Sequence, residues 1–530
     1  MSEHRAAGFV SALKDRSITT GPVDIESFAP AARLSLDAAD WGSAAAVAAQ
    51  AGWRFAGIWG DPFHDRIVLR ACLEQGGTHL VLETEAPLPE PVFASFTPSF
   101  PGADRLERHL EDLLGVAFPE HPDERRWTRH RAWGEADFPL RADFPAAGRQ
   151  PARTPADSGY PFARVDGAGV YEIPVGPVHA GIIEPGHFRF QAVGEEVLRL
   201  EERLGYVHKG IEKIAVDREP VALARLAGRV SGDSTVAHTW AACQAMERAA
   251  RCVVPARAVE LRAILCERER VANHLGDIGA VCNDVGFAFA HVQCARLREQ
   301  WQRRSAELFG HRLMMDAIVP GGVARDLTPG AAGVLKTDHA LLRTSVRPVF
   351  EVIDDYPSLE DRLEDTGILT GDDARALGCT GYVGKASGLD YDVRRHSAYE
   401  PYDRLDLLAR EIPAQSGGDV AARVKVRIRE VLESLEIMDR LLEAMSPGGT
   451  AMELPRPVEN ASGLGLVEGW RGEILTFVRF GETGRVARFF PRDPSWFTWP
   501  ALERLIHGNI VPDFPVCNKS VNGSYSGHDL

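Results

Sequence analysis

The residue types that could do chemistry gather in two segments that lie far apart in the sequence. One is RVSGDSTVAH at residues 229–238, and the other is VNGSYSGHDL at residues 521–530. In the first segment, Ser234 and His238 lie four residues apart and so share one face of the helix expected there. Serine hydroxyls are hard, weak donors that cannot replace thiolates at a soft metal. Neither segment therefore offers the ligands that a soft metal requires.

Two further features could take part in proton transfer or substrate binding. Glu184 and His187 lie three residues apart in the Gly/Pro-rich loop AGIIEPGHF. Such a loop can present a carboxylate and an imidazole to a cavity for proton transfer, although a solvent-exposed pair is the alternative. Arg471, in the sequence EGWRG, could orient an anionic or carbonyl oxygen; the alternative is a plain surface arginine.

Composition limits the classes of partner and cofactor. The chain has 530 residues and a formal net charge of −15, which argues against nucleic acid because phosphate binding needs concentrated positive charge. The eight cysteines include no CxxC pair, so we interpret them as small buried hydrophobes. There is no long apolar run and no signal-peptide core, and no glycine-rich turn has the spacing of a nucleotide-binding loop. We therefore expect a bacterial-type cytoplasmic protein that reaches a membrane only through partners.

The elements that must position these residues divide into two parts separated by a linker. The first part is predicted to be a small α+β unit with a helix, three strands and a second helix, at residues 34–52, 55–59, 65–72, 78–83 and 106–114. Residues 146–165 are rich in Ala, Pro, Gly and Arg and form the predicted linker.

The part after the linker is predicted to be mainly helical. Apolar periodicity predicts long helices at residues 255–279, 291–309, 335–353 and 419–445, and strands at 170–175, 188–193, 196–200, 474–480 and 486–490. Asp233 or Ser234 is expected to cap the helix that follows them. Glu267 and Arg270 are spaced as an intrahelical pair, with His274 one turn on, a pattern typical of a solvated face.

Several motifs, in order, resemble the large subunit of group 4 membrane-bound nickel–iron hydrogenases and formate hydrogenlyase, which is related to the fused 30-kDa and 49-kDa subunits of respiratory complex I. The motifs are His121-Pro122-Asp123, GPVHAGIIEPGHF at 176–188, Arg229 with Gly232 and His238, E-x-x-R-x-x-x-H-L at 267–275, and EGWRG at 468–472. The resemblance implies an α+β fold, with a small α/β domain of the 30-kDa type and then a large, mainly helical domain with peripheral β-hairpins. The implied domains are residues 1–145 and 166–530, joined by the linker at 146–165.

The resemblance also bears on the cofactor. Such hydrogenases bind nickel and iron through four cysteines, and here the matching positions are Ser231, Ser234, Ser524 and Gly527. All four metal ligands are missing, so no metal and no other cofactor is expected on this chain. An iron–sulfur cluster is expected in a partner subunit, and a quinone is the acceptor used by the complex I branch. The complex I tyrosine that contacts the quinone falls at Gly232; Tyr206 and Tyr525 are alternatives between which the sequence does not decide.

The resemblance implies a subunit that passes electrons from a neighbouring iron–sulfur subunit to a quinone-type acceptor in a cavity without nickel and iron. His187 would bind or protonate the head group, with Glu184 and His238 as proton relays and Arg471 as an electrostatic clamp. Other residues expected around the acceptor are His179, Arg229, Gly232 and Tyr525. The alternatives are a non-catalytic scaffold and a true hydrogenase, which would need the missing thiolates. Expected partners are a small iron–sulfur subunit, a ferredoxin-like subunit and integral membrane subunits, on the cytoplasmic side of a bacterial inner membrane.

Overall fold

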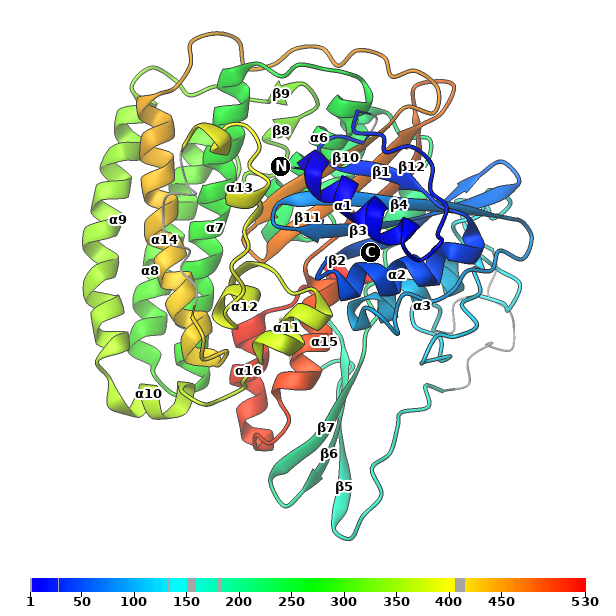
Figure 1. Cartoon of the computed structure of the whole chain (residues 1–530). Coiled ribbons are helices and arrows are strands. Elements are labelled where there is room, and N and C mark those ends of the chain that lie inside the picture. The colour runs from blue at the N-terminus through cyan, green and yellow to red at the C-terminus, as the bar shows by residue number, and fades with distance from the viewer. Residues whose placement is uncertain (1, 27, 131–132, 150–158, 180–182, 406–414) are drawn as a thin grey trace.

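The N-terminal part is a four-stranded sheet packed with helices (Figure 1). The computed structural model describes residues 2–26, 28–130, 133–149, 159–179, 183–405 and 415–530, so the middle of the predicted linker lies outside the described residues. The first elements are α1 (Ser2–Lys14), β1 (Ala32–Ser35), α2 (Trp41–Gln50), β2 (Arg54–Phe63), β3 (Arg66–Gln75), β4 (Thr78–Pro87) and α3 (Asp104–Leu114). The strands lie in the order β1-β4-β3-β2, with β1 parallel to β4 and the other pairs antiparallel.

One sequence prediction is wrong at the start of this domain. The helix predicted from residue 34 begins at Trp41, and residues 32–35 form strand β1 instead. Ala32 and Leu34 are buried, and the backbone of β1 pairs with β4 from Ala32 opposite Leu80 onward. Pairing with a strand distant in sequence therefore overrides the helical propensity of the alanine-rich stretch.

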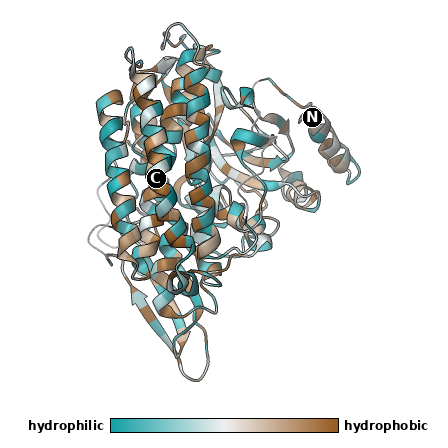
Figure 2. Cartoon of the chain, turned by 90° about the vertical axis from the view of Figure 1, so that its left-hand side faces the viewer, coloured by the Kyte–Doolittle hydropathy of each residue, from teal (hydrophilic) through white to brown (hydrophobic). Residues whose placement is uncertain are grey.

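The second part contains the long helices α7 (Ala256–Asp284), α8 (Ala288–Phe309), α9 (Ala331–Asp354) and α14 (Val420–Glu443), which stand side by side (Figure 1). Figure 2 is turned by 90° so that the left-hand side of Figure 1 faces the viewer, and it shows hydrophilic and hydrophobic residues alternating along each helix. The predicted helices at 255–279, 291–309, 335–353 and 419–445 are thus confirmed to within a few residues at most ends. The fold class is also confirmed as mixed helix and strand.

Shorter elements connect the bundle to the rest of the chain. The helices are α4 (Ile211–Ala215), α5 (Pro220–Ala227), α6 (Thr235–Ala249), α10 (Pro357–Leu363), α11 (Gly371–Leu377), α12 (Gly381–Ala386), α13 (Val393–His396), α15 (Ser495–Leu505), α16 (Phe514–Val521) and α17 (Tyr525–Asp529). The strands are β5 (Val170–Val175), β6 (His187–Val193), β7 (Glu196–Arg203), β8 (Ile318–Val319), β9 (Gly322–Val323), β10 (Ser462–Gly469), β11 (Gly472–Phe480) and β12 (Val486–Arg492). In the described part of the chain, no helix has both the length and the apolar character needed to cross a membrane.

The two three-stranded sheets of this part have different environments. The sheet β5-β6-β7 projects from the body of the molecule as a peripheral hairpin with one added strand (Figure 1). The sheet β10-β11-β12 is central, and every residue of β11 is buried. Helix α6 packs directly on β10, because a side chain at Gly463 or Gly465 would come within 2.1 Å or 1.9 Å of the carbonyl oxygens of Ala245 and Ala241. This close approach fixes α6, and the residues before it, against the central sheet.

The N-terminal domain shares a core with the central sheet. The Trp59 ring stacks on Phe490 at 5.7 Å between centroids. Buried ion pairs cross the same boundary: Arg54 with Glu473 at 2.8 Å, and Arg479 with Asp61 at 2.8 Å. A buried charge is tolerated when a partner neutralises it, so these pairs tie the two parts into one body.

Charged residues also fill the centre of the helical bundle. Glu267, Arg270 and His274 are fully buried on α7, so the solvated face that their spacing alone suggests does not form, and they lie in the centre of the bundle, where the resemblance to the family places such helices. His274 Nε2 lies 2.7 Å from Glu430 Oε2 on α14, and Lys385 Nζ donates to Glu430 Oε1 at 2.7 Å. Burial alone would raise the pKa of Glu430, but Lys385 and His274 hold it well below its ordinary value. The sequence spacing is compatible with either environment, and only the distant partners on α12 and α14 distinguish them.

Candidate functional site

The two segments with chemical residues meet in the folded protein. Ser231 precedes α6 and Ser524 precedes α17, and their hydroxyl oxygens lie 2.8 Å apart. Ser231 donates to Asp233 Oδ1 at 2.7 Å, so the proton between the two serines comes from Ser524. Ser524 Oγ in turn accepts from the Gly527 backbone N–H at 2.9 Å. The structure therefore joins three of the four vacated positions in one hydrogen-bonded chain.

Arg471 completes this chain from the turn between β10 and β11. Its guanidinium binds both carboxylate oxygens of Asp233 at 2.7 Å and donates to the Asn522 carbonyl at 2.7 Å. It also lies 3.2 Å from Ser234 Oγ, the fourth vacated position. Arg471 is only 4% exposed, which excludes the alternative of a plain surface arginine.

The ion pair determines the protonation of Asp233. Burial raises the pKa of its carboxyl, but the Arg471 guanidinium and the Ser231 hydroxyl outweigh that effect and leave the pKa below its ordinary value. Asp233 is therefore ionised at neutral pH and forms an ion pair with Arg471 between the four vacated ligand positions. We name this unit the serine–arginine cluster: Ser231, Asp233, Ser234, Arg471, Ser524 and Gly527.

His238 lies on the inner face of α6 beside the cluster. Its Nε2 atom is 2.8 Å from Asp493 Oδ2, and both side chains are fully buried. Asp493 Oδ1 accepts from the Ser495 backbone N–H at 2.8 Å. Burial raises the pKa of Asp493, but the hydrogen bond and charge of His238 outweigh burial, so the net direction is strongly downward. A Cβ atom at Gly527 would lie 2.8 Å from the Asp493 carboxyl carbon, so only glycine fits beside this pair.

Glu184, His179 and Tyr525 flank the C-terminal side of the cluster. Glu184 Oε2 accepts from the Ser526 backbone N–H at 3.0 Å, and the Tyr525 hydroxyl lies 3.3 Å from His179 Nε2. Burial raises the pKa of Tyr525 and lowers that of His179. Both groups are therefore neutral near pH 7, and Glu184 is exposed to solvent.

His187 faces a different space. It lines a pocket of about 740 Å³ whose other lining residues are Glu124, Arg125, Arg126, His130, Gly159, Tyr160, Pro161, Phe162, Arg203 and Tyr206. Its Nδ1 atom lies 3.2 Å from the Gly176 carbonyl, and its ring is 5.1 Å from that of Phe162. Burial lowers the pKa of His187, so the ring is neutral near pH 7. We name this space the His187 pocket. Tyr206 lines it, whereas Tyr525 flanks the serine–arginine cluster.

Two predicted residues are exposed and form no part of either site. Arg229 forms a two-bond pair with Asp316 at 3.0 Å and 2.9 Å, and both side chains are 42% exposed. Gly232 is exposed, and a Cβ atom there would meet only Met315 at 3.8 Å. The structure does not bring either residue toward His187.

Comparison with known proteins matches both halves of the chain. Residues 38–150 match the family of the respiratory-chain NADH dehydrogenase 30-kDa subunit, and residues 284–460 match that of the 49-kDa subunit. Formate hydrogenlyase subunit 5 of Escherichia coli is 32% identical over 85% of this chain and 79% of its own length. The chain belongs to this family of fused complex I-type and hydrogenase-type subunits. The resemblance inferred from the motifs is thereby confirmed.

Other members of the family show its range. Hydrogenase-4 component G of Escherichia coli is 32% identical over 82% of this chain and 76% of its own length. An NADH-quinone oxidoreductase subunit of Phocaeicola vulgatus is 30% identical over 73% of this chain and 77% of its own length. A chain from the solved structure of an archaeal respiratory membrane complex, the membrane-bound sulfane sulfur reductase, aligns with a TM-score of 0.64 at 26% identity, over 68% of this chain and 99% of that one. This family member is thus similar to hydrogenase, quinone oxidoreductase and sulfur reductase subunits.

A nickel–iron group, which the motif resemblance to hydrogenases implies, does not fit the residues present at the cluster. Three positions offer neutral hydroxyls already engaged in hydrogen bonds, and the fourth is a glycine with no donor. Soft thiolates are what such a group requires. Among the described residues, no three or more His, Cys, Asp or Glu side chains are grouped so that they could hold a metal ion. We therefore derive no step through nickel or iron.

Several residues of this site are missed by reasoning from the sequence. The sequence suggests Asp233 only as a helix cap, yet it is the anionic centre of the cluster. The N-terminus of α6 is instead capped by Glu269 on α7, which accepts from the backbone N–H groups of Val236 and Ala237 at 2.7 Å and 3.1 Å. The prediction of a local cap by Asp233 or Ser234 is wrong, because both side chains are used by Arg471. Asp493 carries no motif, and only its contact with His238 identifies it.

Proposed function

We propose that this subunit passes electrons from a neighbouring iron–sulfur subunit to a quinone-type acceptor, at a site without nickel and iron. The observation that carries the proposal is the serine–arginine cluster, in which serines, an ion pair and a glycine stand at the four ligand positions of the hydrogenase relatives. Its groups satisfy one another without a metal. Electron delivery is assigned to a partner because no cysteine cluster lies in the described part of this chain.

We place the acceptor in the His187 pocket. The volume of about 740 Å³ lies in the range of small-molecule sites, and the lining includes the aromatic rings of Tyr160, Phe162 and Tyr206. An aromatic head group can stack on such rings. The Arg203 guanidinium, which donates to the Arg126 carbonyl at 2.8 Å, lies over the Tyr160 ring and adds a positive charge beside this space. Reduction of a quinone to a quinol takes two electrons and two protons. His187 and Tyr206 are the groups of the pocket that we assign to binding the head group and passing protons.

The cluster has a supporting role in this proposal. Glu184 is exposed and hydrogen-bonded to the Ser526 N–H, so it can exchange protons with solvent and relay them inward. Arg471 provides a fixed positive charge that is held by Asp233. His238 is a candidate relay because its Nε2 atom is hydrogen-bonded to Asp493 at 2.8 Å. The partners that we propose are a small iron–sulfur subunit, a ferredoxin-like subunit and integral membrane subunits.

The test combines metal analysis with turnover of the purified complex. We expect no stoichiometric nickel, and we expect His187→Asn and Glu184→Gln each to reduce electron transfer to a soluble ubiquinone analogue. Matched controls are His64→Asn and Glu482→Gln, which change exposed residues on other surfaces and should leave turnover intact. Stoichiometric nickel would refute the proposal.

A non-catalytic scaffold is the second candidate function, and the fully hydrogen-bonded cluster favours it because no reactive group is left open there. The two candidates differ in the same assay. Unchanged turnover in both His187→Asn and Glu184→Gln would support the scaffold. Because the solved relative is a sulfane sulfur reductase, polysulfide is the second acceptor to be assayed. Turnover with polysulfide and not with quinone would mean that the subunit is catalytic but that its acceptor is polysulfide.

A further inference from the structure

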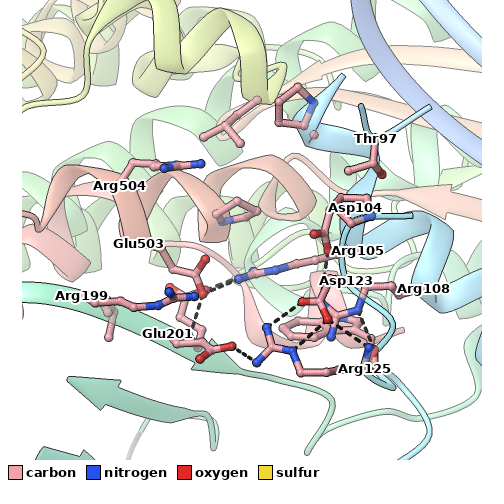
Figure 3. A pocket seen from close by; sticks show the side chains of 18 of the residues that line it. Thr97, Asp104, Arg105, Arg108, Asp123, Arg125, Arg199, Glu201, Glu503 and Arg504 are labelled. Carbon is pink, nitrogen blue, oxygen red and sulfur yellow. Dashed lines mark hydrogen bonds and ion pairs between the residues drawn. The ribbon is translucent and has the colours of Figure 1, made fainter. Parts of the chain in front are cut away.

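A pocket of about 590 Å³ lies between the N-terminal domain, strand β7 and helix α15, away from the cluster (Figure 3). Its wall includes the first turns of α3, the segment around Asp123 and Arg125, and the last turn of α15. Charged side chains of both signs point into it. This pocket, which we name the arginine pocket, shares Arg125 and Tyr160 with the His187 pocket, but its remaining lining residues have no part in the proposed electron transfer.

The inner charges of the arginine pocket are paired. Arg105 joins Glu202 at 3.1 Å and Glu503 at 2.9 Å. Arg108 lies 3.1 Å from both Asp104 and Asp123. Arg125 likewise binds Asp123 and Glu201. Each of these three arginines has two carboxylate partners, so they are structural ion pairs that link three segments of the chain.

Two other arginines of the pocket differ from these. Arg199 on β7 and Arg504 on α15 form no hydrogen bond or ion pair through their side chains with any residue in the described ranges. Figure 3 shows them on the same side of the pocket, on either side of Glu503. His507 lines the same pocket. Burial lowers its pKa, and the charges of Arg504 and Arg199 lower it further against the opposing charge of Asp373. A positive edge without a carboxylate partner is thus built from two separate elements.

A buried acceptor in the same pocket also lacks a partner. Glu202 is fully buried, and its Oε1 atom has no hydrogen-bond partner in the described part of the chain. Burial raises its pKa well above the ordinary value, and the neighbouring Glu503 raises it further, against the lowering effect of Arg105. The pKa of Glu503 is raised as well, mainly by burial, and both shifts favour the protonated forms, which lessens the negative charge of this part of the pocket.

We propose that the arginine pocket binds a small molecule that bears a phosphate group. Two guanidinium groups can each bind a phosphate through paired N–H donors. The several oxygens of a phosphate can accept from both arginines and still reach a third donor, whereas a carboxylate has only two oxygens. The pocket volume is within the range of small-ligand sites and leaves room for an organic group beside the phosphate. Inorganic phosphate and a phosphate ester share this chemistry.

The test is calorimetric titration of the full chain, and of its complex, with inorganic phosphate and with adenosine monophosphate as the ester probe. The variant Arg199→Ala/Arg504→Ala should fold normally, since neither side chain has a partner to lose. We expect it to weaken phosphate binding at least tenfold. The matched control Arg303→Ala/Arg375→Ala removes two exposed arginines elsewhere and should leave the affinity unchanged.

The outcomes separate the sources of the ligand. Tighter binding of the ester than of inorganic phosphate assigns the pocket to an organic phosphate, and equal binding assigns it to the free anion. Absence of binding to either probe overturns the proposal, as does equal loss of affinity in the variant and the control. These outcomes are independent of nickel content and of quinone turnover.

Discussion

Restoring a cysteine at residue 527 should destabilise the C-terminal segment rather than rebuild a metal site. An ideal Cβ atom at Gly527 would lie 2.8 Å from the Asp493 carboxyl carbon and 2.9 Å from its Oδ2 atom. Asp493 cannot move freely, because His238 binds one of its oxygens and the Ser495 N–H binds the other. The variant Gly527→Cys must therefore break one of these buried hydrogen bonds.

The size of the effect follows from two opposing contributions. Forcing extra atoms into a well-packed site typically costs about 1–3 kcal/mol, and cysteine places two atoms there. Cysteine regains only about 0.3 kcal/mol over glycine in helix propensity, and Gly527 lies in the short helix α17. We take about 2 kcal/mol as the net loss, which corresponds to an increase of about 30-fold in the open population of this segment.

Native-state hydrogen exchange measures this local opening directly. Amides of residues 524–530 in Gly527→Cys should exchange about 30-fold faster than in the parent protein. Gly232→Cys is the matched control, since that position belongs to the same pair of segments but is exposed, and an added Cβ atom there would lie 3.8 Å from its nearest neighbour, the Met315 side chain. Exchange should change less than about threefold there. Equal exchange in Gly527→Cys and the parent would show that the packing argument at Asp493 is wrong.

Three other changes test separate parts of the molecule. Arg471→Lys keeps a cation but loses the paired N–H donors to Asp233, so quinone turnover of the complex should fall about tenfold, or ~1.4 kcal/mol; unchanged turnover would exclude the role of a clamp. His109 and Arg488 flank Glu212, and although burial opposes them, the pKa of Glu212 falls to about 2. A carboxyl whose pKa is lowered in the folded state stabilises the fold at any pH above its unfolded pKa, and this stabilisation is lost as the pH falls through the folded pKa. The free energy of unfolding should therefore fall by about 3 kcal/mol between about pH 4.5 and 2. Glu212→Gln should flatten that acid-unfolding limb, and a parallel pH dependence in the two proteins would contradict the assignment. Glu430→Gln leaves Lys385 and its neighbours short of one buried charge and should lower the free energy of unfolding in guanidinium by about 3–5 kcal/mol; a loss below about 1 kcal/mol would mean that the network relaxes around the change.

Local sequence patterns predict those elements whose stability depends on their own residues. Strand β5 has the bounds expected from its sequence, and α14 begins after Asp419, whose carboxylate accepts from the Ala422 N–H at 2.7 Å. The prediction fails at β1 because its partner β4 decides its conformation. It fails at the cap of α6 because the accepting carboxylate belongs to Glu269, on the next helix. Contacts between distant elements are what single-sequence patterns do not contain.

In the candidate site too, the sequence indicates individual residues but not the contacts between distant segments. The motifs alone point to Ser231, Ser234, Ser524 and Gly527, and the structure joins all four through hydrogen bonds of one cluster. Spacing cannot predict that Asp233 binds Arg471, since the two lie on separate segments joined only by the fold. Nor can it separate His187 from this cluster, because the loop that carries Glu184 and His187 sends the two side chains to different spaces.

Because His187 and the serine–arginine cluster face different spaces, only one of the two can be where an acceptor binds. At the cluster, each substituted position supports another: Ser524 donates to Ser231, Ser231 donates to Asp233, and Arg471 binds Asp233 and contacts Ser234. A set of groups that satisfy one another gains nothing from an added metal and loses hydrogen bonds if one is inserted. An acceptor needs space, and space lies instead in the His187 pocket of about 740 Å³. In the proposed function, electron transfer therefore ends on a substrate beside His187. The cluster, which has serines and a glycine in place of thiolates, holds the segments 229–238 and 521–530 together.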